Sequence, residues 1–208
     1  MSDIPGAAPV LDPRSARAPS AETIAFAEDI ATSVRGFLDA LPTIATQATP
    51  GQAVSLLLLE IGQIALAGAR LGVQRDFDPR EEYQPDVGPD ADVEELRMRI
   101  AELLGDADTY SYVFDPYRPE LVTGLLSDDL ASIAADLELG LRHHGRGDVD
   151  EALWWWQFSY VSSWGAQAGA AMKALLSVVA HDRLDVEVPS EEDQVAAVST
   201  TLDSGEEQ

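Results

Sequence analysis

The polar residues best placed for chemistry form a line along one predicted helix. Asp129, Ser132, Asp136 and Gly140 recur at i, i+3, i+7 and i+11, a spacing that brings them to one side of a helix. Two carboxylates beside aromatic rings favour a cationic or amine-bearing ligand. The alternative is a solvated helix flank whose acids only complement the positive end of the helix dipole.

The following helix should run antiparallel to this line and close to it. Its Trp156, Ser163 and Gln167 could then face the two carboxylates. The sequence therefore predicts a groove between residues 127–144 and residues 148–181. The residues predicted to bind a ligand or a partner are Trp155, Trp156, Asp129, Asp136 and Gln167.

Three consecutive tryptophans, Trp154 to Trp156, begin that second helix. At about 100° per residue they point in three directions, and Trp155 lies opposite the apolar side of the helix. Three arrangements of Trp155 stay open. The first and favoured one packs it under another helix of the same chain, and the others place it in a subunit interface or in a ligand pocket.

Other residues of chemical interest lack the spacing that a catalytic or metal site needs. The three histidines are His143 and His144 at a predicted helix end, and the distant His181, so they form no metal-binding set with a carboxylate. The chain has no cysteine, which excludes thiolate chemistry and disulfides. We therefore predict no catalytic residue, no metal and no cofactor, and favour a protein that is not an enzyme.

Helical periodicity dominates the chain before these residues. A first helix begins after Ser20, a favourable N-cap, and should stop near Pro42. A second begins at Thr49-Pro50-Gly51-Gln52, where Gln52 completes a capping box. Its polar stripe is narrow (Glu60, Gln63, Ala67 and Arg70), which predicts a central and mostly buried helix.

The rest of the chain also predicts helices. A third helix should span about 91–104, and a short helical turn should follow through Tyr110, Val113 and Phe114. No stretch alternates apolar and polar residues long enough to predict a strand. A fourth helix runs from Ser127 to Gly145, and a fifth from Asp148 to about residue 181, with a possible break near Gly165.

Two pairs of glycines predict close packing between helices. Gly165 and Gly169 lie one turn apart on the last helix, and Gly68 and Gly72 have the same spacing on the second. Because glycine has no side chain, two such patches allow helix backbones to approach each other. We therefore expect these two pairs to face one another.

The charge and the two ends narrow the function classes. The formal net charge is −24, and a field of this sign repels nucleic-acid phosphates and anionic lipid. Residues 1–20 are rich in proline and residues 185–208 are acidic, so both ends should be disordered. Polar residues interrupt the most apolar run, 53–73, which argues against a membrane span. The expected location is the cytoplasm.

Three stretches resemble a known protein family. They are YVFDPY (112–117), LSDDLASIAADLELGL (126–141) and WQFSYVSSWG (156–165). Together they are similar to a bacterial family of unknown function, numbered 5063 and common in actinobacteria, over roughly residues 24–182. The resemblance implies a soluble helical protein with no assigned activity, so it transfers no catalytic residue.

The sequence thus predicts an all-α protein: a single bundle of about five helices with a long C-terminal helix. The bundle domain should span residues 21–184, between the two disordered tails. We expect a non-catalytic protein-interaction module that forms a homodimer or binds an unknown protein. The alternative is a binder or enzyme for a cationic or amine-bearing small molecule, with its site between residues 127–144 and 148–181.

Overall fold

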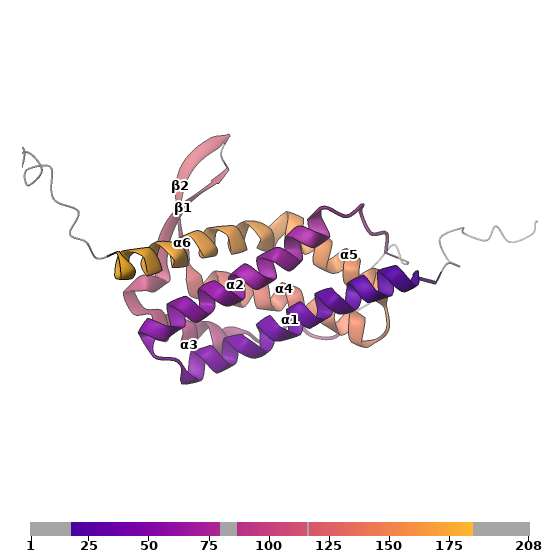
Figure 1. The fold of residues 1–208 in the computed structure, drawn as a ribbon, viewed down its shortest axis with the longest axis horizontal. Helices are drawn as coiled ribbons and strands as arrows, with labels where there is room; N and C mark the ends of the chain where they lie inside the picture. The colour runs from indigo at the N-terminus through magenta and orange to yellow at the C-terminus, as the bar shows by residue number, and fades with distance from the viewer. Residues whose placement is uncertain (1–17, 80–86, 116, 185–208) are drawn as a thin grey trace, which may run out of the picture.

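The computed structural model describes residues 18–79, 87–115 and 117–184. The tails predicted to be disordered, 1–20 and 185–208, lie almost wholly outside the described residues. Between them the chain forms a helical bundle with a long C-terminal helix, as the sequence predicts. Figure 1 shows the helices lying side by side, with one hairpin projecting from them.

Helix α1 spans Ala21–Gln47, and its first turn confirms the predicted cap. The Ser20 hydroxyl accepts a hydrogen bond from the Thr23 backbone N–H at 3.1 Å. The prediction that the helix ends near Pro42 is wrong, because α1 continues through this proline. Leu41 and Ile44 on either side are both buried, and two such side chains contribute about 2 kcal/mol each, which offsets the roughly 3 kcal/mol cost of a proline.

Helix α2 spans Pro50–Gly72, and Gln52 Oε1 accepts the Thr49 backbone N–H at 3.2 Å. The expectation that α2 is central and mostly buried is only partly right. The helix packs on α1 and α6 with one face and leaves Leu59 and Leu66 exposed on the opposite face. Among the described residues it is the one helix long and apolar enough to cross a membrane, a test that core helices of soluble proteins also pass.

Helix α3 (Glu94–Leu104) and a short 3₁₀ turn, η1 (Gly105–Asp108), lead into a β-hairpin. Strand β1 (Thr109–Asp115) pairs antiparallel with β2 (Arg118–Leu125). The predicted helical turn at 110–114 and the predicted absence of strands are therefore wrong. The stretch alternates Tyr, Ser, Tyr, Val and Phe, and aromatic and β-branched residues favour strands.

Helix α4 spans Leu126–Gly145, and its first turn is capped by a residue distant in sequence. The buried Asp108 carboxylate accepts the Ser127 backbone N–H at 2.7 Å and the Ser127 hydroxyl at 2.8 Å. These bonds fix η1 against the start of α4. They also place β1, which begins at the next residue, directly beside the acid line of α4.

The C-terminal helix is continuous from Val149 to Arg183, with one irregular turn. It comprises α5 (Val149–Ser159), a π-helical turn η2 (Tyr160–Trp164) and α6 (Gly165–Arg183). In η2 the Gly165 N–H bonds to Tyr160 O, five residues back. The irregularity expected near Gly165 is therefore a widened turn, not a break.

The glycine pairs do not face one another. Side chains added at Gly68 or Gly72 would meet the rings of the η2 turn, chiefly Tyr160, while one added at Gly169 would meet nothing. The α2 glycines therefore make room for aromatic rings from η2. The predicted backbone contact is wrong because the π-helical turn carries bulky residues to this crossing.

Candidate functional site

The acid line of α4 faces the C-terminal helix, as the antiparallel arrangement predicts. Asp129 and Asp136 lie on the side of α4 that η2 and α6 cover, and each is largely withdrawn from solvent. Gln167 of α6 hydrogen-bonds the Asp129 carboxylate. Ser163 of η2 does the same for Asp136.

Asp129 is the more enclosed of the two acids. The Tyr110 hydroxyl on β1 donates to Asp129 Oδ2 at 2.5 Å, so the hairpin is bonded to the first turn of α4. Burial raises the pKa of Asp129, and the hydrogen bond from Tyr110 opposes that rise. Burial, followed by the bond to the carboxylate, raises the pKa of the Tyr110 phenol. The pair therefore holds the hairpin in place and is poorly suited to release a proton.

Asp136 lies two turns further along α4, roughly 10 Å from Asp129 at 1.5 Å per residue. Burial raises the pKa of Asp136, and the hydrogen bond with Ser163 lowers it in part. At this separation the two carboxyl groups cannot share a proton as an acid–base dyad does. Each is bonded instead to side chains of the same chain.

Trp155 and Trp156 donate hydrogen bonds to different residues of α4. Trp156 is fully buried, stacks over Gly140, and donates from Nε1 to Leu137 O at 3.0 Å. Trp155 is half-buried and donates to Asp136 O at 2.8 Å. Trp155 thus takes the first of its three predicted arrangements, packed under another helix of the same chain.

The structure therefore brings the five predicted residues to one interface, between α4 and the C-terminal helix. Most of their polar atoms form hydrogen bonds within the chain, and among the described residues Gln167 Oε1 is buried without a hydrogen-bond partner. Sequence reasoning missed Tyr110, because the strand that carries it was assigned to a helical turn. Trp154 is partly buried and stacks on Phe158.

The electrostatics of Asp136 predict a pH-dependent gain in stability for Asp136→Asn. A carboxyl whose pKa is raised on folding holds its proton more tightly in the folded state, so stability falls as pH rises through the folded-state pKa. The cost of the buried charge is thus present at neutral pH and lost in acid. Asparagine keeps the acceptor for Ser163, so the variant should gain roughly 1 kcal/mol at pH 7, or about 2–4 °C in Tm.

The measurement is urea denaturation of both proteins at pH 7 and at about pH 4, close to the ordinary pKa of an aspartate. The gain should shrink as pH falls, because wild-type Asp136 then takes up its proton. Asp39→Asn, on the exposed side of α1, removes the same formal charge and should change stability by less than about 0.5 kcal/mol. An equal gain at both pH values would contradict a burial effect at Asp136.

The histidines at the end of α4 have structural surroundings. His143 is buried, and this burial lowers its pKa, so the ring is neutral at pH 7. His144 lies 3.3 Å from the Glu28 carboxylate and near the Trp156 ring. Within the described ranges, no three histidine or acidic side chains come together as a metal site requires.

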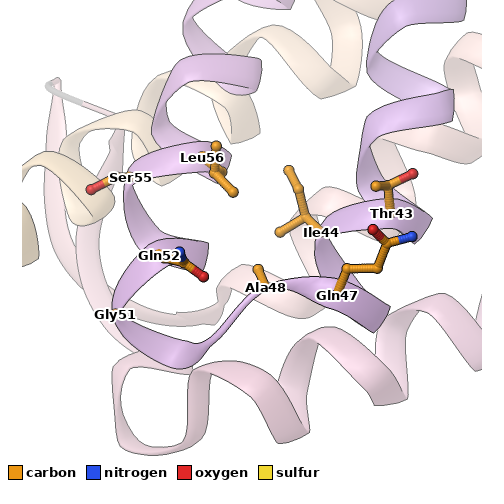
Figure 2. A pocket seen from close by; sticks show the side chains of 8 residues that line it. All are labelled: Thr43, Ile44, Gln47, Ala48, Gly51, Gln52, Ser55 and Leu56. Carbon is orange, nitrogen blue, oxygen red and sulfur yellow. The ribbon is translucent and has the colours of Figure 1, made fainter.

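An open pocket of about 460 Å³ lies at the corner between α1 and α2. In Figure 2, Ile44 and Leu56 extend into the space between the two helices, and Thr43, Gln47 and Gln52 lie around it. None of its eight lining residues is ionisable. This pocket therefore offers apolar contact and neutral hydrogen bonds but no acid–base chemistry.

In the residues that the structure describes, the fold and the site define a class of protein: a helical bundle with one β-hairpin, in which the central acids of α4 are hydrogen-bonded within the chain. The chain belongs to the family described as Domain of unknown function (DUF5063), whose model matches residues 22–181. The resemblance inferred from the sequence is thereby confirmed. No curated protein matches the chain.

One solved structure similar to this chain is the crystal structure of protein BF1032 from Bacteroides fragilis, a structural-genomics target. The two share 19% sequence identity with a TM-score of 0.54, over 76% of this chain and 89% of the other. At this identity the likeness shows the fold alone. It supports the bundle architecture and transfers no site residue.

Proposed function

We propose that this protein is a non-catalytic interaction module that forms a homodimer through an apolar face on α2 and α6. The observation that carries the proposal is a row of exposed large apolar side chains on neighbouring helices. This α2–α6 face consists of Leu59, Leu66 and Val73 on α2 and its C-cap, and of Met172 and Leu176 on α6.

Three large apolar side chains of α2 and its C-cap are mostly exposed to solvent. Leu59, Leu66 and Val73 recur every seven residues and are 56%, 65% and 81% exposed. This spacing places them on one side of the helix, along roughly 20 Å at 1.5 Å per residue. Large apolar side chains this exposed, aligned on one side of a helix, are typical of a protein-interaction surface.

The backbone of the same face is open to close approach. Gly62 lies between Leu59 and Leu66 on α2, and Gly169 precedes Met172 on α6. A side chain added at either glycine would meet no atom within 4 Å. Large side chains flanking an open glycine form the ridges and grooves into which another helix packs.

Charge and area favour a second copy as the occupant. The side chains that define the face are uncharged, and the bordering Arg70 is paired with Asp29, although the chain carries a net charge of −24. In a two-fold dimer the same patch meets itself, so uncharged surface meets uncharged surface and the acids stay outside. Five side chains of this exposure offer on the order of 500 Å², a large part of the ~800 Å² that each partner contributes to a standard interface.

The double variant Leu59→Glu with Leu66→Glu is expected to be monomeric where the wild type is dimeric. Two carboxylates per protomer would meet their copies across the face, which desolvation and repulsion both oppose. Sedimentation or light scattering over a concentration series measures the mass. Leu121→Glu, at a leucine exposed on strand β2, is the matched control and should stay dimeric.

Salt gives an independent readout of the same interface. Because apolar surface holds the dimer and net charge opposes it, raising NaCl from about 0.05 to 0.5 M should tighten the dimer by screening the acids. A dimer held by ion pairs would weaken instead. A wild type that stays monomeric at about 100 µM, or a double variant that dimerises equally well, would contradict the proposal.

Binding of a cationic ligand is a second candidate function. At the predicted groove the carboxylates of Asp129 and Asp136 are bonded to Tyr110, Gln167 and Ser163. The observation that favours cation chemistry lies at the other end of the tryptophan run, around Trp154.

A further inference from the structure

Trp154 lines a pocket at the junction of α5, η2 and the segment that follows α2. The pocket has a volume of about 350 Å³. Aromatic rings and carboxylates dominate its walls. The rings are those of Phe77, Trp154 and Phe158, and the carboxylates are those of Asp76 and Asp78.

The rings of Trp154 and Phe158 form an aromatic wall that remains partly exposed to solvent. Trp154 and Phe158 lie one turn apart on α5, with ring centroids 5.1 Å apart and planes within 5° of each other. Stacking fixes both rings, since each restricts the rotation of the other. Phe158 nevertheless remains 52% exposed, so a large part of this wall is available to a ligand.

The carboxylates are positioned by a buried amide. Gln157 is 6% exposed, accepts the Phe77 backbone N–H at 2.9 Å and donates to Leu71 O at 2.9 Å. It therefore ties the segment after α2 to α5. Asp76 and Asp78, on either side of the bonded Phe77, are carried to the rim of the pocket by the same two hydrogen bonds.

Rings with adjacent carboxylates form an environment that suits an organic cation. The negative face of an aromatic ring attracts an ammonium or guanidinium group, most strongly at tryptophan. The chain uses this chemistry beside the pocket, where the Arg70 guanidinium lies 5.4 Å from the centre of the Phe26 ring. Phe26 in turn stacks on Phe77, with ring centroids 6.2 Å apart.

We propose that this pocket binds an organic cation, an alkylammonium or guanidinium group, between the Trp154–Phe158 wall and the carboxylates of Asp76 and Asp78. The same cation can be a free small molecule or a basic side chain of a partner protein. The site is separate from the α2–α6 face, so the proposed cation binding does not depend on the proposed homodimer.

The test uses choline and its neutral isostere 3,3-dimethyl-1-butanol, which has the same shape without the charge. Two-dimensional NMR of the full-length protein follows the Trp154 indole N–H as each compound is added. Choline is expected to shift this resonance with saturation and to bind at least about tenfold more tightly than the neutral alcohol. Equal binding of the two compounds, or no saturable shift with choline, would overturn the proposal.

Two variants locate the binding site. Asp76→Asn with Asp78→Asn should weaken choline binding about tenfold or more, and Trp154→Leu should do the same, as judged in that variant by the Phe77 backbone resonance. The matched control, Asp39→Asn with Asp90→Asn, removes the same formal charge from exposed positions that do not line the pocket. If the control pair weakens binding as much as the pocket pair, only the net charge matters and the proposal fails.

A second arm identifies the source of the cation. Choline is compared with a short neutral peptide that contains one arginine and with the same peptide carrying citrulline at that position. Tighter binding of the arginine peptide than of choline assigns the pocket to a partner's side chain, and the reverse order assigns it to a free small molecule. Binding of the citrulline peptide as tightly as the arginine peptide would overturn the requirement for charge.

Discussion

Substitution of Trp156 by alanine is expected to lower the free energy of unfolding by about 3–5 kcal/mol. The side chain is fully buried between α5 and α4, and its Nε1 donates to Leu137 O at 3.0 Å. Alanine would remove the largest apolar contact between these two helices and leave a cavity. Because a domain is stable by only about 5–15 kcal/mol, the variant should be partly unfolded at 37 °C.

The comparison variant is the neighbouring Trp154→Ala, which removes the same atoms from a partly buried position that lines an open pocket. Its expected cost is smaller, about 1–2 kcal/mol, because part of this ring is already in contact with water. Urea denaturation followed by far-UV circular dichroism compares the two without relying on tryptophan fluorescence. Equal losses from both variants would contradict the assignment of Trp156 alone to the core.

The helices were predictable because the information that forms them is local. Long runs with apolar residues every three or four positions specify α1, α2 and α4 from neighbouring residues alone. Caps such as Ser20 act over three residues. Where two such helices follow each other through a short loop, their antiparallel contact also follows, so the meeting of Ser163 with Asp136 could be inferred.

The hairpin and the pocket depend on contacts between distant residues. Strand β1 depends on its pairing with β2 and on the bond from Tyr110 to Asp129 of α4, so local periodicity alone gives a weak signal. The pocket exists because Gln157 bonds to Phe77, 80 residues earlier in the chain. A single sequence does not indicate which buried glutamine will bond to which loop, so a pocket lined by Trp154 is not predictable from it.

The role of Gly140 follows from its contacts in the structure, although its position in the sequence already places it on the acid line. The sequence placed it fourth on the acid line of α4, with no side chain to contribute to a site. In the structure the Trp156 ring packs directly against Gly140, so that a Cβ atom at this position would overlap the indole. The absence of a side chain is thus what lets α5 lie close to α4.

Gly140→Ala is accordingly expected to destabilise the protein by about 1–3 kcal/mol, through overpacking against Trp156. This sign opposes the intrinsic preference, since alanine in a helix interior is ordinarily about 0.5–1 kcal/mol better than glycine. Gly36→Ala in α1 is the matched control, because an added Cβ there meets no atom within 4 Å. The control should be stabilised by that ordinary amount.

The two glycine variants therefore should move the urea midpoint in opposite directions. A smaller ring should relieve the clash, so Gly140→Ala should cost less in a Trp156→Leu background than in the wild type, and the double-mutant cycle measures the coupling between the two positions. If Gly140→Ala stabilises the protein as Gly36→Ala does, the indole does not rest on this glycine. The close packing of α5 on α4, and with it the placement of Trp155 against Asp136, would then be wrong.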